Sequence, residues 1–127
     1  MPFAIGERYG YIINSPTGYN YITGGGGVVL SRAAIIKFSR KSKCDCPSNS
    51  VPDDMFLFGV CLNRLNITLV HVPLFHQARP NDYSDDYLSI GEPISFHKHW
   101  MIDPNQVYND WFEDADNLHS ENIHVEL

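Results

Sequence analysis

The segment Tyr21-Ile22-Thr23-Gly24-Gly25-Gly26-Gly27-Val28-Val29-Leu30-Ser31 decides the fold class. Residues 19–22 alternate in the manner of a short strand. Four glycines then lead into a second apolar segment at 28–30. Ser31 suits the N-cap of a helix that contains Ala33, Ala34, Ile35, Ile36 and Phe38. Strands and helices that alternate in this way predict an α/β fold.

The pattern continues along the rest of the chain. Pro52-Asp53-Asp54 opens a second helix with Asp53 as N-cap, and its apolar face would contain Met55, Phe58, Leu62 and Leu65. From Glu113 onward the residues are mainly polar and acidic and predict a frayed tail. The other expected elements are strands at 9–13, 67–72 (buried) and 94–97, a short helix near 85–88, and a helix from Asp103-Pro104 to about Phe112.

Charge and hydropathy exclude two classes of protein. Nine Lys and Arg against fifteen Asp and Glu give the 127 residues a net charge of −6, whereas nucleic-acid binding requires a basic face. The longest uninterrupted apolar run, Met55–Leu62, is far shorter than the about 18 residues of a membrane span. We therefore expect one globular domain without nucleic acid as a partner.

The four consecutive glycines allow two interpretations. Without Cβ atoms they permit positive φ and let a ligand approach the backbone closely, so they form either a tight turn or a substrate contact. Neither nucleotide motif fits them. The dinucleotide fingerprint needs a glycine where Val29 stands, and a phosphate loop needs Gly-Lys-Ser/Thr. Both interpretations stay open from the residues alone.

Two positions are candidates for chemistry. At a helix start, a carboxylate interacts favourably with the helix dipole. This capping role accounts for one of the two residues Asp53 and Asp54, but it does not need the second. A pair of carboxylates can hold one as a general base while the other orients it. His76 is the second candidate, because it follows the end of a strand, where ligand sites of α/β proteins gather.

The three cysteines, Cys44, Cys46 and Cys61, allow either a disulfide or, with His76, a structural zinc site. Their spacing differs from that of zinc knuckles, so we favour a disulfide from Cys44 or Cys46 to Cys61. His97 and His99 would lie on opposite sides of an extended chain, which disfavours a shared metal.

Two signals indicate the secretory pathway. Asn66-Ile67-Thr68 is an N-glycosylation acceptor, and His124-Val125-Glu126-Leu127 differs at one position from an ER-retention tetrapeptide. The first residues do not form a signal peptide, so an entry signal or anchor would be encoded upstream. We expect the ER lumen, or association with ER or Golgi membranes, with an ER-retention receptor as a partner.

Five segments carry a family resemblance and span residues 6 to about 111: Gly6-Glu7-Arg8-Tyr9-Gly10, Tyr21–Gly27, Pro52-Asp53-Asp54-Met55, Leu74–Pro80 and Ser95–Trp100. They resemble the fringe-like β1,3-glycosyltransferases of glycosyltransferase family 31. Within that family, the likeness is greatest to the branch that extends O-linked fucose on thrombospondin type 1 repeats. The terminal Val-Glu-Leu is similar to the ER-retention ends of that branch.

The resemblance implies the carboxyl-terminal half of a GT-A domain, a Rossmann-like mixed sheet flanked by helices, over residues 1–112, with a polar tail at 113–127. It implies an inverting transfer of a hexose, glucose from UDP-glucose, to the 3-hydroxyl of O-linked fucose on a protein. The implied partners are thus a UDP-sugar and an O-fucosylated acceptor. Mn²⁺, the ion of this family, neutralises charge on the departing diphosphate.

The resemblance also assigns roles to particular positions. Asp54 matches the catalytic base, with Asp53 beside it, and His76 matches the metal ligand. The disulfide that surrounds the Asp pair in related transferases corresponds to Cys46–Cys61. The substrate-binding positions implied are Gly24, Gly25, Gly26, Gly27 and His97.

One motif of the family does not match. Its Asp-x-Asp metal motif precedes the glycine run, whereas the only Asp-x-Asp here, Asp114-Ala115-Asp116, lies in the polar tail, where we interpret it as solvated surface. We therefore expect a fragment that lacks the donor half and does not turn over by itself. The alternative function is a non-catalytic fringe-like glycan-binding module or an inactive relic.

Overall fold

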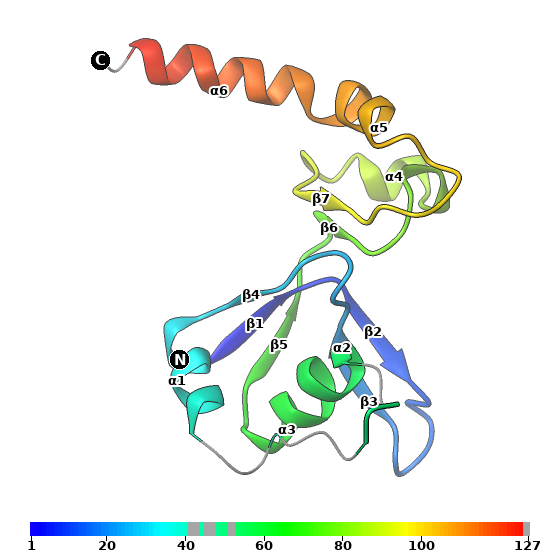
Figure 1. Ribbon diagram of the computed structural model, residues 1–127, viewed down its shortest axis with the longest axis vertical. Helices are drawn as coiled ribbons and strands as arrows, with labels where there is room; N and C mark the ends of the chain where they lie inside the picture. The colour runs from blue at the N-terminus through cyan, green and yellow to red at the C-terminus, as the bar shows by residue number, and fades with distance from the viewer. Residues whose placement is uncertain (41–43, 45–47, 51–52, 126–127) are drawn as a thin grey trace.

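The computed structural model describes residues 1–40, 44, 48–50 and 53–125 and has a mixed α/β architecture (Figure 1). In chain order, the elements are β1 (Phe3–Gly6), β2 (Arg8–Tyr11), β3 (Tyr19–Ile22), β4 (Val29–Leu30), α1 (Arg32–Ser39), α2 (Asp53–Met55), the π-helical η1 (Phe56–Cys61), α3 (Leu62–Arg64), β5 (Thr68–His71), β6 (Phe75–His76), the 3₁₀ helix η2 (Pro80–Asp82), α4 (Asp85–Leu88), β7 (Ser95–Phe96), α5 (Pro104–Trp111) and α6 (Glu113–Val125). The expected α/β class is confirmed.

Three small sheets organise the described chain. The largest has the strand order β4-β1-β5 and is mixed, because β1 pairs antiparallel with β4 and parallel with β5. β2 and β3 form an antiparallel hairpin, and β6 pairs parallel with β7. Figure 1 shows β6 and β7 at the end of the main sheet, with α5 and α6 beyond them. The glycine run connects β3 to β4. It lies where the main sheet meets the β6–β7 pair, since the Gly26 N–H bonds to Gln77, the residue after β6.

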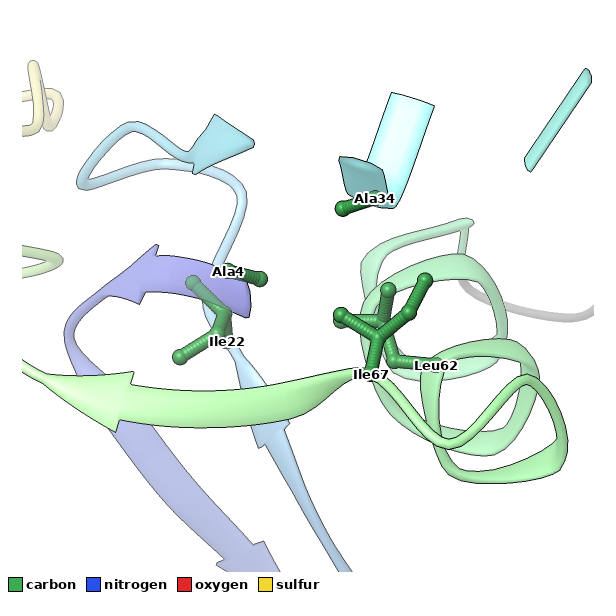
Figure 2. Packing of buried hydrophobic residues seen from close by; sticks show 5 residues of the cluster. All are labelled: Ala4, Ile22, Ala34, Leu62 and Ile67. Atoms are coloured by element: carbon green, nitrogen blue, oxygen red, sulfur yellow. The ribbon is translucent and has the colours of Figure 1, made fainter. Parts of the chain in front are cut away.

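The aliphatic core lies between the main sheet and the helices (Figure 2). It consists of five buried side chains from β1, β3, α1, α3 and the residue just before β5, namely Ala4, Ile22, Ala34, Leu62 and Ile67. Ser31 caps α1 as predicted, since its Oγ accepts the Ala34 N–H at 3.2 Å. Burial of such apolar surface is the main favourable term in folding.

The face predicted for the helix that begins at Asp53 is confirmed in part. Leu62 belongs to the core, and Phe58 and Leu65 pack against it. The structure also buries Phe56, Gly59 and Cys61, which the sequence did not predict. The reason is the π-helical segment η1. Its wider i→i+5 hydrogen bonding breaks the 3.6-residue period on which the prediction depended.

Two further expectations are wrong. The strand predicted as buried at 67–72 is β5, which lies at a sheet edge with Thr68 and Val70 exposed. The frayed tail is instead the helix α6, which reaches Val125. Acidic residues in its first turn interact favourably with the helix dipole, and Tyr108 Oη donates to Asp116 Oδ2 at 3.0 Å. No helix in the described part of the chain is long and apolar enough to cross a membrane.

A disulfide joins Cys44 to Cys61, with Cα atoms 5.3 Å apart. The Cys46–Cys61 pairing implied by the family resemblance is therefore wrong in this structure, and Cys46 lies outside the described residues. The zinc interpretation is wrong as well, because it requires the thiolates that the disulfide consumes. The bond ties residue 44 to the helix that begins with Asp53 and Asp54.

Peptide mapping without reduction tests the pairing. We expect a Cys44–Cys61 linked peptide in the oxidised protein. The substitution Cys46→Ser should retain this link and alter the free energy of unfolding by less than about 0.5 kcal/mol. Reduction of the bond should lower that free energy by about 3 kcal/mol, because the intact disulfide closes a loop between cysteines 17 positions apart. A Cys46–Cys61 peptide in the wild-type chain would contradict the structure.

Gly59 sets how closely η1 packs on β3. A Cβ at this position would lie 2.7 Å from the Cβ of Tyr21 and 3.0 Å from the ring of Tyr19. Alanine gains about 1 kcal/mol of helix propensity, but overpacking against atoms so near the backbone costs about 1–3 kcal/mol. We therefore expect Gly59→Ala to lower the free energy of unfolding, measured in urea.

Gly91→Ala is the matched control for that experiment. Its Cβ would meet only the flexible end of Leu74, at 3.1 Å, so we expect a change within about 0.5 kcal/mol. A Gly59→Ala variant as stable as the wild type would show that η1 does not pack on the tyrosine hairpin in this way.

Candidate functional site

The first glycine of the run contacts Asp54. The Gly24 N–H donates to Asp54 Oδ2 at 3.3 Å, while Oδ1 accepts the Met55 N–H at 2.9 Å. A Cβ on Gly24 would lie 3.2 Å from the Cβ of Asp54, closer than side chains ordinarily pack. A carboxylate has about four acceptor positions, so the half-buried Asp54 retains lone pairs for another donor. Asp53 is the first residue of α2, and the surroundings of its side chain lie outside the described part.

The next two glycines contact the segment that follows β6. The Gly26 N–H donates to Gln77 Oε1 at 3.1 Å. A Cβ on Gly25 would lie 1.9 Å from His97 Cδ2 and 2.5 Å from Gln77 Oε1. A Cβ on Gly26 would lie 3.1 Å from the Gln77 backbone nitrogen. The approach at Gly25 requires glycine, and a Cβ at Gly26 would force the adjacent backbone to shift.

The run is also a tight turn. Gly27 has φ of 97°, and its N–H donates to the Gly24 carbonyl at 3.1 Å. The turn interpretation of the four glycines is thus confirmed, whereas the substrate contact stays a prediction. The atoms that approach the glycine backbone in this structure are the protein's own, from Asp54, Gln77 and His97, so the run joins three elements into one strip of surface.

One ring nitrogen of His76 has no hydrogen-bond partner in the part of the chain that the structure describes. The side chain is 1% exposed, and Nδ1 lies 2.8 Å from the carbonyl oxygen of Ser95. Because a carbonyl can only accept, Nδ1 carries the proton in this contact. The buried Nε2 has no hydrogen-bond partner among the described residues and presents a lone pair. An imidazole whose other N–H is held by a carbonyl is the usual form of a metal-ligating histidine.

Aromatic rings surround His76. Phe96 stacks on it with ring centroids 4.3 Å apart, and Tyr83 meets it edge-on at 4.8 Å. Trp111 of α5 packs on Phe96 at 5.5 Å. The imidazole therefore lies in an environment of low polarity, where electrostatic interactions are stronger than in water.

Glu7 connects this aromatic cluster to the rest of the site. Its carboxylate is 4% exposed and accepts the Gln77 N–H at 2.5 Å and the Tyr83 hydroxyl at 3.0 Å. The Tyr83 oxygen in turn accepts the Ala78 N–H at 3.0 Å. Burial raises the pKa of Tyr83, and the hydrogen bond to Glu7 raises it further, so Tyr83 remains a donor.

His97 and His99 lie on the same side of the chain, contrary to prediction. Their rings stack with centroids 4.7 Å apart, and His99 Nε2 donates to the Gln77 carbonyl at 2.9 Å. The alternation of a strand does not apply to them, because β7 ends at Phe96. His97 also lines a cavity of about 190 Å³ that lies against α5.

The structure brings most of the predicted positions together. Asp54, the glycine run, His97 and the strand of His76 are connected by the contacts above. Asn66, the predicted glycosylation acceptor, lies apart in an exposed turn with φ of 54°, and its glycosylation remains a prediction. The first turn of α6 contains Asp114 and Asp116, which are exposed as expected.

Sequence reasoning missed Glu7, Gln77, Tyr83 and Ser95. Glu7, Gln77 and Ser95 lie in segments that carry the family resemblance, and their place in those segments could have identified them. Tyr83 lies outside these segments. Ser95 Oγ donates to the Gly26 carbonyl, so it joins β7 to the glycine run. Among the described residues, no group of three or more His, Cys, Asp or Glu side chains is arranged to hold a metal ion.

Comparison with known proteins agrees with this geometry. A sequence model of the Fringe-like family matches residues 1–127. The chain is 56% identical to human β-1,3-glucosyltransferase over 115 residues, which are 91% of this chain and 22% of the relative. It is 54% identical to the mouse β-1,3-glucosyltransferase over 110 residues, 87% of this chain and 22% of the relative.

The chain thus spans about a fifth of the length of these curated relatives. No solved structure matches it. The family match extends over the whole chain, and the mixed sheet with flanking helices agrees with the fold of that family. The chain therefore belongs to the Fringe-like family, which consists of glycosyltransferases of the GT-A type.

Proposed function

We propose that this chain carries the acceptor-activating part of an inverting β1,3-glucosyltransferase. The donor would be UDP-glucose and the acceptor the 3-hydroxyl of O-linked fucose on a protein. The relatives named β-1,3-glucosyltransferase support the reaction class. The observation that carries the proposal is the glycine run, whose N–H groups bond Asp54 at one end and Gln77, next to His76, at the other.

Asp54 acts as the general base in this proposal. The fucose 3-oxygen attacks the anomeric carbon of the donor, the bond from that carbon to the diphosphate oxygen breaks, and UDP leaves with the electron pair. The hydroxyl proton passes to the Asp54 carboxylate. The Gly24 and Met55 N–H groups hold this carboxylate in a fixed orientation, which leaves the remaining lone pairs for the acceptor.

His76 fits one ligand position of a divalent ion. Its buried Nε2 has a free lone pair, and the Ser95 carbonyl fixes the ring. When bound, Mn²⁺ would neutralise charge on the departing diphosphate. The described residues hold no group of three ligands, so the proposal assigns this chain one ligand, His76, and leaves the remaining positions to substrate, water or another segment.

A second candidate function is glycan binding without transfer. For the isolated chain, which we expect to be inactive by itself, this candidate is compatible with a described region that forms no three-ligand metal group. The two candidates differ in one respect: a binding module needs an acceptor surface, whereas a transferase also needs the Asp54 carboxylate to accept a proton.

We also propose the ER lumen as the compartment, with an ER-retention receptor as a partner. The Cys44–Cys61 disulfide supports an oxidising compartment. The exposed position of Asn66 is compatible with glycosylation. Association with ER or Golgi membranes stays part of the same proposal.

A chimera tests the proposed reaction. This chain replaces the matching segment of human β-1,3-glucosyltransferase, and glucose transfer from UDP-glucose to an O-fucosylated peptide is measured. We expect an active chimera in which Asp54→Asn lowers kcat/KM by about 100-fold or more, because proton removal contributes about 10²–10⁴-fold. Asp114→Asn, on the exposed start of α6, is the matched control and should leave kcat/KM unchanged.

Two outcomes would contradict the proposal. Full activity of the Asp54→Asn chimera would exclude Asp54 as the base. A chimera that binds the O-fucosylated peptide but transfers no glucose would favour the glycan-binding module instead.

Gly25→Ala tests the close approach at the glycine run. The added Cβ would overlap His97 Cδ2, at 1.9 Å, and displace the imidazole. We expect kcat/KM of the chimera to fall about 10- to 100-fold, as for misplacement of site groups by about 1 Å. His97→Ala in the same background makes room, so the two losses should be less than additive. Strict additivity would show that Gly25 and His97 do not meet.

A further inference from the structure

We propose that Glu7 is a positioning residue that provides the buried negative charge for a divalent cation at His76 without ligating it. This inference rests on the proposed function, since it assumes a cation at His76. The structure supports it through three features of Glu7: its burial, the lack of a basic partner for it among the described residues, and its direct contacts with the two groups next to the imidazole.

Glu7 is the only buried carboxylate in the part of the chain that the structure describes. Its side-chain partners there are the Gln77 N–H and the Tyr83 hydroxyl, both uncharged donors. The ion pair found among the described residues joins Arg79 to Asp82 and does not involve Glu7. Burial of a charge without a counter-charge is unfavourable, so a purely structural role would be served better by a neutral acceptor such as glutamine.

The groups described around the Glu7 carboxylate are uncharged. The Gln77 N–H and the Tyr83 hydroxyl donate to it, and the Tyr87 ring stacks on that of Tyr83. A cation bound at His76 would supply the counter-charge that these neighbours do not.

Contacts place that charge beside His76. The Gln77 N–H that Glu7 accepts belongs to the residue directly after His76. Tyr83, which donates to Glu7, also meets the His76 ring edge-on at 4.8 Å. Phe96 covers another side of the ring at 4.3 Å. In this poorly polar environment a nearby carboxylate attracts a cation more strongly than in water, and such outer-sphere groups typically change metal affinity by about 10- to 100-fold.

Titration of the chimera with Mn²⁺ in the presence of UDP tests the inference, because the rest of the transferase and the diphosphate then offer the remaining ligand positions of the ion. The readout is the paramagnetic broadening of the His76 ring signals in NMR spectra, which does not depend on transferase activity. We expect Glu7→Gln, which keeps an oxygen acceptor but removes the charge, to weaken the apparent affinity about tenfold or more. Glu7→Asp, which keeps the charge, should stay within about threefold of the wild type. His76→Ala gives the background.

Each outcome decides a different claim. Equal affinity of wild type and Glu7→Gln would overturn the role of Glu7 and leave His76 as a ligand. Equal losses in Glu7→Asp and Glu7→Gln would show that hydrogen-bond geometry matters and the charge does not. Absence of broadening at His76 in the wild type would overturn the metal role itself.

If Glu7→Gln does not fold, the variant Tyr83→Phe decides instead, because it removes the hydroxyl that donates to Glu7 but keeps the charge of Glu7. If Tyr83→Phe retains the wild-type affinity for Mn²⁺, the inference is supported, and if it loses that affinity about tenfold, the inference is overturned.

Discussion

The close approach of other elements to the backbone at Gly24–Gly27 is the constraint on which the site depends. Cβ atoms on Gly25 or Gly26 would meet His97, Gln77 or the backbone of β6 at 1.9–3.1 Å. Because no side chains intervene, the glycine amides can bond directly to Asp54 and Gln77. One short segment thereby fixes the spacing between the candidate base and the strand of the candidate metal ligand.

Two packed clusters support this segment from opposite sides. The aliphatic core, which includes Ala4, Ile22 and Leu62, anchors the strands before and after the glycines. The aromatic cluster of His76, Phe96 and their neighbours anchors the short β6–β7 sheet. Glu7 bonds to residues beside each cluster, since its backbone carbonyl accepts the Thr23 N–H, next to Ile22, and its carboxylate accepts the Gln77 N–H, next to His76.

Local patterns of the sequence predict much of the fold. The cap at Ser31, the strand Tyr19–Ile22 and the proline-led helix at Pro104 follow from rules that involve neighbouring residues only. The strand β1 was missed, because its parallel partner β5 lies more than sixty positions away in the chain. The buried face of η1 was missed because a π-helical turn leaves no mark on the hydrophobic period.

The site was predictable only where a motif assigned a role. The carboxylate pair and the end of a strand made Asp54 and His76 candidates, the family resemblance gave them the roles of base and metal ligand, and the structure adds the contacts that connect their surroundings. The choice between Cys44 and Cys46 requires a spatial distance, which spacing along the chain does not provide. Glu7 follows a four-residue strand and carries no local sign of burial, so its partners became visible only when the chain was folded.

The most direct test of the central claim is a crystal structure of the chimera with UDP, Mn²⁺ and an O-fucosylated peptide. The claim is that the glycine run unites Asp54 and His76 in one site. It predicts the fucose 3-hydroxyl within hydrogen-bond distance of Asp54, along the glycine run, and an anomalous manganese peak at His76 Nε2. An acceptor bound away from Asp54, or manganese bound away from His76, would contradict it.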